Sequence, residues 1–427
     1  MKKINRKYTI GFLLVLLVAY LAILAKEKGD FRCFLEAAGL MREGKNIYGV
    51  YLSDGIGLYY YSPLFAMLLV PFTYVPPFIP NLLWLIFSAF LVYRIWKLIR
   101  EDFDLTAFSK KQINLLVFIT FACMIRFLLY NFGLIQMTIF MLWAILESNR
   151  LFDRDKPIQG SVLLALAINI KLLPLVVLPY LVYRKKYKPF LMTILFLIVF
   201  LFLPALFIGK KTNLFLLNEW WHVINPVQQG HQFETEWGVH SLTALIPTLL
   251  MVTEGELAMK RNIVDLSPEL VGRIALVVRL LFIVFTLYFL TNNKNKVITA
   301  IQKNWELAYI TLVIPLIFPH QQKYVFYMLF PAIAYITYFL IYVHNTNYTV
   351  IRKSKWNVIV GLMIMAFALM TLTTDGLIGR HYNNITQHYK TITYGAVLIA
   401  VALAISNPRY LNAGQLNAEQ KNNDLPE

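Results

Sequence analysis

Acidic side chains are scarce in this sequence, in which 23 Asp and Glu residues stand against 40 Lys and Arg residues and give a formal net charge of +17. Only 15% of the 427 residues are charged, whereas 58% are hydrophobic. This composition indicates a polytopic membrane protein. The basic residues are spread over short loops, where anionic lipid headgroups explain most of them, so no nucleic acid partner is expected.

Cysteine is nearly absent, since Cys33 and Cys123 are the only two in the chain. Cys123 falls within a predicted membrane span, and the pair predicts neither a structural disulfide nor a metal signature. The sequence also lacks GxGxxG, P-loop, HExxH, CxxC and GxSxG motifs. Any chemistry must therefore rest on scattered polar residues, and no cofactor is expected.

Long apolar runs dominate what is present. Stretches of roughly 15 to 22 residues recur from Tyr8 to Ile405, separated by short basic or Asn-rich turns, which is typical of a helical bundle rather than a barrel. No small-residue cleavage site follows the first run, so it is predicted to be a retained anchor. The predicted spans, about twelve, are 9–25, 79–98, 113–130, 134–148, 160–171, 173–183, 189–208, 271–290, 305–319, 324–342, 357–373 and 391–405.

Clusters of Lys and Arg in short loops set the orientation, because such loops stay on the cytoplasmic side. If residues 59–75 crossed the membrane, the basic run 94–100 would lie outside. This proline-broken segment is therefore predicted to lie on the outer face as a juxtamembrane helix. The pieces 160–171 and 173–183 are each too short to span, and a re-entrant hairpin would leave the topology unchanged. We expect one integral-membrane domain over 1–407, with outer loops 26–78 and 209–269, and a disordered cytoplasmic tail over 408–427.

Asp30 is the leading candidate for a catalytic residue. It follows the first span, and among the loop carboxylates Asp30, Glu36, Glu43 and Asp54 it alone lies within a turn or two of a membrane span. Partial burial there would raise its pKa toward that of a working base. The alternative is a solvated helix N-cap, since Gly-Asp precedes a helix-like run over 31–42.

Four basic residues could bind a phosphate near the outer surface. Lys171 is the one lysine in the apolar stretch 161–183, where a charge is costly and usually has a partner. His320 and Lys323 share a polar turn at the end of another span, and Arg126 lies near the outer end of its span. The alternatives are that Lys171 is a snorkelling lysine, that His320 is an interfacial polar group and that Arg126 is an anchor at the lipid headgroups.

The largest outer loop mixes aromatic, amide and carboxylate side chains between Trp220 and Ser241. Sugar sites have this composition, and Trp237 and His240 are the candidates within it. Interfacial aromatic belts have the same composition and remain the alternative.

Several short motifs resemble glycosyltransferase family 87, the polyprenol-phosphate-mannose-dependent mannosyltransferases with the GT-C fold. The order 30–31 (DF), 44–48 (GKNIY) and 59–64 (YYYSPL), with Pro71, is similar to the first third of these enzymes. Residues 131–136 (NFGLIQ) resemble the family's Asn-Gly-Gln turn, and residues 160–174 its Lys-x-x-Pro stretch. The resemblance covers most of the chain, although each motif is short.

The resemblance implies a GT-C bundle in the plasma or inner membrane, with its active site on the outer face and a role in cell-envelope glycan biosynthesis. Asp30 occupies the position of the family's acidic residue in the first outer loop, which acts as the catalytic base. His320 matches a histidine in a later outer turn, where Gln321 and Gln322 depart from the family pattern.

A mechanism follows from these expectations. Asp30 would take the proton of a glycan or glycolipid hydroxyl, which attacks the anomeric carbon of a polyprenyl-phosphate-linked sugar and inverts it. Lys171, His320, Lys323 and Arg126 would neutralise the departing lipid phosphate. Residues expected to contact sugar or acceptor are Tyr61, Gln136, Trp237 and His240. A leaving group with one phosphate and a cationic cluster requires no essential metal.

Two other function classes remain open. A lipid-linked sugar flippase or transporter would also use a basic intramembrane residue and broken spans, but it needs paired charges near the midplane. Most predicted spans contain no acidic residue, and no internal repeat is visible. A polysaccharide polymerase or ligase would share the outer-loop chemistry with a pyrophosphate-linked donor.

Overall fold

The computed structural model describes residues 6–27, 29–52, 57–225, 234, 236, 238–255, 257–292 and 299–411. Within these ranges the secondary structure is helical, apart from two isolated bridges that pair Leu52 with Gly57 and Val239 with Gln322. Trp237 and most of the predicted tail, from residue 412 onward, lie outside the described residues. The protein is therefore all-α over the part described, as its hydropathy predicts.

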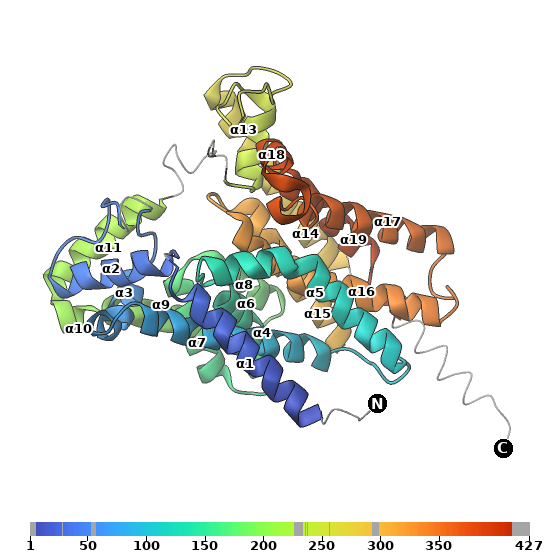
Figure 1. Ribbon diagram of the computed structural model, residues 1–427, viewed down its shortest axis with the longest axis horizontal. Helices are drawn as coiled ribbons and strands as arrows, with labels where there is room; N and C mark the ends of the chain where they lie inside the picture. Colours follow the sequence, from blue (N-terminus) through green and yellow to red (C-terminus); the bar gives the residue numbers. More distant parts are fainter. Residues whose placement is uncertain are drawn as a thin grey trace. The chain divides into compact units, whose positions relative to one another are not determined.

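The chain divides into two compact units, the first formed by residues 1–96 and 129–225 and the second by residues 97–128 and 226–427. Helices α4 (Phe78–Glu101) and α5 (Lys110–Gly133) have residues in both units. Figure 1 labels the α-helices. The first unit contains α1 (Arg6–Leu24), α2 (Phe31–Arg42), α3 (Pro63–Leu69), η1 (Val70–Tyr74), α6 (Thr138–Asp153), α7 (Pro157–Ile170), η2 (Leu173–Val176), α8 (Val177–Tyr183), α9 (Tyr187–Phe202), α10 (Ala205–Ile208) and α11 (Lys210–Ile224).

The second unit is built mainly from its C-terminal helices. Its elements are α13 (Leu242–Leu250), α14 (Pro268–Asn292), α15 (Ala300–Ile317), η3 (Lys323–Leu329), α16 (Phe330–Asn345), α17 (Lys353–Met370), α18 (Asp375–His388) and α19 (Thr391–Ile405). Helix α16 lies at the centre, because most of its side chains, including Tyr335 and Phe339, are fully buried. Helices α17 and α19 pack closely, and a Cβ on Gly395 would lie 2.2 Å from Cγ of Met370.

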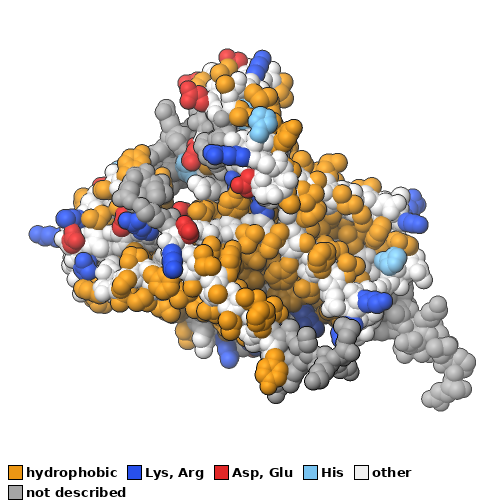
Figure 2. Space-filling view, viewed as in Figure 1, with side chains coloured by type: hydrophobic (Ala, Val, Ile, Leu, Met, Phe, Trp, Pro, Cys, Tyr) orange, Lys and Arg blue, Asp and Glu red, His pale blue; other side chains and the backbone are white. Residues whose placement is uncertain are grey.

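Seven apolar helical segments are long enough to cross a membrane among the described residues. They are Phe78–Glu101, Lys110–Gly133, Tyr187–Ile208, Pro268–Tyr288, Lys323–Asn345, Lys353–Met370 and Thr391–Leu411. Exposed leucines on α9 and α14, such as Leu195 and Leu281, are the surface expected against lipid. Figure 2 shows hydrophobic side chains spread over much of the visible face. The protein is a polytopic membrane protein.

Each of the twelve predicted spans overlaps a helix, but the number that cross stays a prediction. The pieces predicted at 160–171 and 173–183 form short helices separated by non-helical backbone at Lys171. The proline-broken segment 59–75 forms α3 and η1 instead of one long helix. Ser62 caps α3 and accepts a hydrogen bond from the Phe65 amide, with Pro63 in the first turn.

Candidate functional site

Asp30 in the first unit is positioned by a close approach between two backbone segments. Its amide donates to the carbonyl oxygen of Leu134 over 3.0 Å. A Cβ on the preceding Gly29 would lie 2.9 Å from that same oxygen, closer than real Cβ atoms come. Glycine is therefore required next to Asp30 because any side chain would push the two segments apart.

The opposing segment is the turn after α5 that carries Gln136. Ile135 is fully buried and has a φ of 52°, in the left-handed region that β-branched residues rarely adopt. The Gln136 amide donates to the Asn131 carbonyl over 2.9 Å, and the Trp84 indole donates to the Gln136 carbonyl over 3.1 Å. These bonds fix the turn from both sides and direct the Gln136 side chain.

The Gln136 amide nitrogen donates to the Asp30 carboxylate. Asp30 itself has helical backbone angles at the start of α2, and its side chain makes no capping hydrogen bond. The N-cap alternative is therefore wrong for its carboxylate. Burial raises the pKa of Asp30, while the charge of Lys171 and the bond from Gln136 oppose that rise.

Lys171 follows α7 in extended backbone, at the break between two short helices. Its ammonium lies 5.5 Å from the centroid of the Tyr61 ring, within the range of a cation–π interaction. Its charge also acts on Asp30. The structure thus brings together Asp30, Gln136, Lys171 and Tyr61, four residues that the sequence singled out separately.

Tyr61 is held by the aromatic motif around it. Its ring lies 4.4 Å from that of Phe34 between centroids, and its carbonyl accepts from the Tyr48 hydroxyl over 2.8 Å. The Tyr59 hydroxyl donates to the Ser62 carbonyl over 3.0 Å, so the buried residues Tyr59, Tyr61 and Ser62 form a fixed corner from which Tyr60 is exposed. Tyr48 and Tyr59 are therefore supports, and Tyr61 is the member beside Lys171.

A second polar cluster lies within the second unit around His240. Its side chain is fully buried and edge-on to Phe326, with 6.5 Å between ring centroids. Neither ring nitrogen has a hydrogen-bond partner in the described part of the chain. The His240 amide donates to the Gln321 carbonyl over 2.8 Å, and Thr393 donates to the His240 carbonyl. The backbone is thus anchored while the imidazole is left to bind something else.

The electrostatics around His240 favour its neutral form. Burial places its pKa well below the usual value, and the positive charges of Lys390, Lys323 and Arg126 lower it further. A neutral imidazole in cationic surroundings can donate one hydrogen bond and accept another. These surroundings suit an anion or a hydroxyl-rich ligand.

Lys390 is a member of this cluster that the sequence reading missed. It is fully buried at a positive φ of 56°, and its ammonium donates to the Glu236 carbonyl over 2.8 Å. Burial and the charge of Arg261 lower its pKa to about 7, against the opposing carboxylates of Glu234 and Glu236. The available sequence signal was a lysine directly before the last apolar run.

His320 also belongs to the second cluster. It has a φ of 55°, and its Nδ1 atom contacts the Glu234 carboxylate. Burial and the neighbouring Glu234 charge raise the pKa of Glu236. The sequence reading noted carboxylates in this loop but gave neither glutamate a role, since their partners are distant in the chain.

Arg126 is buried and already engaged. Its guanidinium donates to the Met370 carbonyl over 2.7 Å, to the Thr373 hydroxyl over 2.6 Å and to Asn383 over 3.2 Å. It is 3% exposed, so the headgroup-anchor alternative is wrong. Arg126 ties α5 to the end of α17 and to α18, and contributes charge to the surroundings of His240.

No group of three or more His, Cys, Asp or Glu side chains among the described residues is placed to hold a metal ion. The predicted sugar-binding Trp237 cannot be placed, because it lies outside the described residues. The two clusters thus consist of carboxylates, cations, amides and rings.

The first cluster combines a buried carboxylate, an amide, a cation and an aromatic ring. Such a combination fits an enzyme that acts on a polar group at a membrane surface. The family model for glycosyltransferase family 87 matches residues 59–302, more than half of the chain. The chain belongs to this family and is a glycosyltransferase. Gln136, Lys171 and His240 lie inside the match, whereas Asp30 precedes it and His320 follows it. No curated protein and no solved structure matches the chain.

Proposed function

We propose that this glycosyltransferase moves a sugar, mannose, from a polyprenyl-phosphate-linked donor to a hydroxyl of a glycan or glycolipid. The reaction takes place at the outer face of the cell membrane, within a GT-C type bundle, in the synthesis of an envelope glycan. The observation that carries the proposal is the Asp30 carboxylate, hydrogen-bonded by Gln136 beside the charge of Lys171.

Asp30 acts as the general base. Its raised pKa brings the carboxylate closer to the working pH, which improves its ability to take a proton in the transition state. Gln136 holds the carboxylate in one orientation through a side chain that is only 2% exposed. Asp30 removes the acceptor hydroxyl proton as the oxygen bonds to the anomeric carbon.

The departing lipid phosphate takes the electrons of the broken bond and needs positive charge. In the first unit, Lys171 supplies it. The second unit has a phosphate-binding cluster of its own, in which Lys323, His320 and Lys390 are the donors and Arg126 contributes charge. Each role is assigned within its own unit.

Direct displacement inverts the anomeric carbon, and no covalent glycosyl-enzyme intermediate forms. The sugar and acceptor contacts are assigned to aromatic and amide groups that suit hydroxyl-rich ligands. These are the ring of Tyr61, the free carbonyl oxygen of the Gln136 side chain, the imidazole of His240, and Trp237.

The test is transfer of radiolabelled mannose from polyprenyl phosphate mannose by membranes that contain equal amounts of wild type, Asp30→Asn or Glu43→Gln. Glu43 is the matched control, since it lies in the same segment but is exposed and paired with Lys45 over 2.7 Å. Asp30→Asn is expected to lower transfer roughly 10²- to 10⁴-fold, the usual contribution of a general base. Glu43→Gln should match wild type.

Equal transfer by wild type and Asp30→Asn would remove Asp30 from the mechanism. If wild type transfers nothing from this donor but is active with another lipid-linked sugar, the mannose assignment fails and the base is tested again with the active donor. Movement of labelled donor across sealed vesicles without transfer would instead support a flippase.

A further inference from the structure

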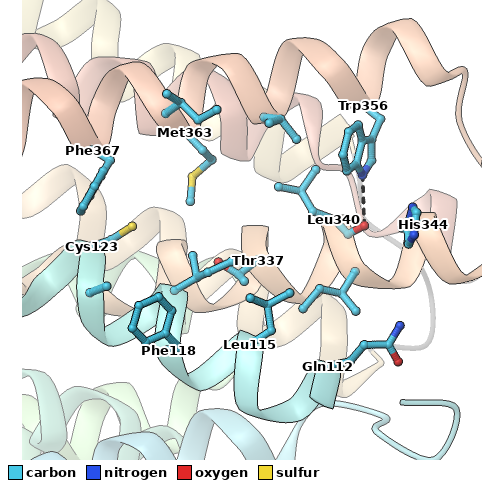
Figure 3. A pocket seen from close by; sticks show the side chains of 15 residues that line it. Gln112, Leu115, Phe118, Cys123, Thr337, Leu340, His344, Trp356, Met363 and Phe367 are labelled. Atoms are coloured by element: carbon cyan, nitrogen blue, oxygen red, sulfur yellow. Dashed lines mark hydrogen bonds between the residues drawn. The ribbon is translucent and has the colours of Figure 1, made fainter. Parts of the chain in front are cut away.

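A cavity of about 540 Å³ lies within the second unit between α5, α16 and α17. Its walls are apolar over most of their length, with Phe118 from α5, Leu340 from α16 and Phe367 from α17 (Figure 3). Met363 and Thr337 form part of its buried floor, being 7% and 2% exposed. None of the residues proposed for sugar transfer lines it.

The cavity opens sideways, toward the surface expected to face lipid. Three lining side chains are largely exposed: Leu115 at 46%, Phe118 at 70% and Ile364 at 64%. A molecule could therefore enter from the bilayer without passing through water. An apolar cavity with this access suits a hydrocarbon chain.

The two ends of the cavity differ in chemistry. Gln112, His344 and Trp356 gather at one end, whereas Cys123 and Phe367 lie at the other (Figure 3). The Trp356 indole donates to the Leu340 carbonyl over 3.0 Å, which is a suitable arrangement for an aromatic residue at a membrane interface. The polar end is thus the headgroup end.

Basic residues continue from this polar end. Lys110 and Lys111 begin α5 directly before Gln112. Arg352 precedes α17 and Lys353 begins it, four and three residues before Trp356. All four are exposed. Such a cluster beside an apolar slot complements an anionic lipid headgroup.

The length of the cavity matches one leaflet. Its lining runs from residue 112 to 123 on α5 and from 356 to 367 on α17, a separation of eleven positions along each helix. At 1.5 Å per residue this is about 16 Å, close to half of a hydrocarbon core of about 30 Å. By the distribution of basic loops, the polar end faces the cytoplasm.

We propose that this cavity binds an anionic phospholipid of the cytoplasmic leaflet, with one acyl chain between α5, α16 and α17 and its headgroup against Lys110, Lys111, Arg352 and Lys353. The bound lipid fills the space between three helices and stabilises the second unit. This site is independent of the assignment of donor and base.

The test measures lipid binding to the full-length protein by native mass spectrometry, with phosphatidylglycerol and phosphatidylcholine as probes. Val360→Trp places a large ring in the cavity, whereas Val358→Trp makes the same change on α17 at a residue that is 52% exposed and does not line it. Wild type and Val358→Trp are expected to retain phosphatidylglycerol, and Val360→Trp to lose at least tenfold in binding. Equal binding by the two variants would overturn the proposed site.

Headgroup recognition is tested with Arg352→Gln and Lys353→Gln together. Loss of two charges near the membrane surface is expected to weaken phosphatidylglycerol binding roughly tenfold or more, at about 1 kcal/mol per charge. Lys185→Gln with Lys188→Gln, in another basic loop, is the control and should bind as wild type. Equal affinity of wild type for the two lipids, or displacement of phosphatidylglycerol by equimolar polyprenyl phosphate, would refute the proposed occupant.

A thermal measurement supports the binding assay. Added phosphatidylglycerol should raise the Tm of wild type and of Val358→Trp, because a ligand that binds only the folded state stabilises it. Val360→Trp should show no such rise. A rise of equal size in Val360→Trp would place the stabilising lipid elsewhere and contradict the proposal.

Discussion

At Asp30, two opposing effects act on one carboxyl group. Burial raises its pKa, while the charge of Lys171 and the hydrogen bond from Gln136 favour the ionised form. Burial is the larger effect, so the pKa of Asp30 is raised above its ordinary value of 3.8. The carboxylate can act as a base only at a pH above this raised pKa. Lys171, which is proposed to supply positive charge to the departing phosphate, thus also affects the pH range in which Asp30 acts as a base.

We expect kcat/KM to fall on the acid side as pH drops through the raised pKa of Asp30, because protonation removes the base. Lys171→Met removes the charge that opposes burial and should move this acid limb to higher pH. Lys45→Met, an exposed lysine in the same outer segment, should leave the limb in place. A limb that stays fixed in Lys171→Met would show that Lys171 does not act on the base.

Lys390 leads to a pH dependence of the opposite sense. With a pKa lowered to about 7, it is charged below that pH and loses its charge above it. A polyprenyl phosphate diester keeps its negative charge throughout. KM for the donor should therefore rise as pH increases through about 7, by roughly tenfold if one charged hydrogen bond is lost.

Lys390→Arg tests this directly, since a guanidinium remains charged over the whole range. The KM of Lys390→Arg for the donor should be independent of pH near neutrality. The KM of Lys390→Met should be above that of wild type at low pH and should not change with pH. A wild-type KM that does not change between pH 6 and pH 8 would contradict a role for Lys390 in donor binding.

The sequence identified many of these residues but not their partners. Asp30 and Gln136 are 106 residues apart, and their hydrogen bond depends on a backbone approach that only Gly29 permits. Lys390 carried no motif, and its burial could not be read from a lysine next to an apolar run. Single residues with unusual placement were predictable, whereas three-dimensional pairing was not.

At the scale of elements, the loop residue Gly29 and helix α2 together position Asp30. Gly29 allows the chain to approach the turn that carries Gln136, and α2 then buries Phe31 and Phe34 against aromatic neighbours. The Phe31 ring stacks on Trp84 with 5.8 Å between centroids, and Trp84 also holds the Gln136 carbonyl. Local packing thus determines the position of the base.

A matched pair of glycines separates this effect from helix propensity. Gly29→Ala should lower both the Tm and transfer activity, because its Cβ would collide with the Leu134 carbonyl. Gly39→Ala, inside α2 with no atom within 4 Å of the added Cβ, should instead stabilise the fold by up to about 1 kcal/mol. Thermal unfolding in detergent and the mannose-transfer assay measure the two effects.

Unchanged activity in Gly29→Ala would mean that the turn can move without displacing the base. Loss of stability in Gly39→Ala would show that α2 is constrained by something other than its own propensity. The two outcomes are independent because the glycines lie at opposite ends of the segment.

Helices were the most predictable level of structure. Each predicted apolar run overlaps a helix, because hydropathy over roughly 20 residues is a strong signal. The break at Lys171 was also predicted, since the apolar stretch was divided there into the pieces 160–171 and 173–183. The capping interpretation of Asp30 was wrong, because a polar residue before a helix indicates a cap only when nothing else competes for its side chain.

At the scale of the whole molecule, the basic loops predict which side of the membrane each loop faces, and cysteine labelling measures it. A cysteine-free background, Cys33→Ser with Cys123→Ser, allows single cysteines to be introduced at Lys45 and at Lys185. An impermeant maleimide added to intact cells should label Lys45→Cys and not Lys185→Cys until the membrane is opened, because Lys45 is predicted outside and Lys185 inside. Labelling in the reverse order would invert the proposed orientation.

The grouping of helices into two compact units could not be predicted from the sequence, and the single integral-membrane domain over residues 1–407 stays a prediction. Each unit is assembled from segments separated by long insertions, residues 1–96 with 129–225 and residues 97–128 with 226–427. Hydropathy gives the order of helices along the chain but not which of them pack together.

Ile135 carries an evolutionary consequence of its own. A branched side chain in left-handed backbone is strained by about 1–3 kcal/mol, yet it is fully buried and adjoins Gln136. Drift toward glycine or asparagine would relax the backbone and open a void in the packing at the same time. Selection for heat tolerance therefore acts on the strained backbone of Ile135, and selection for turnover acts on its buried side chain beside Gln136. Neighbouring core residues must change with Ile135 before it can be replaced.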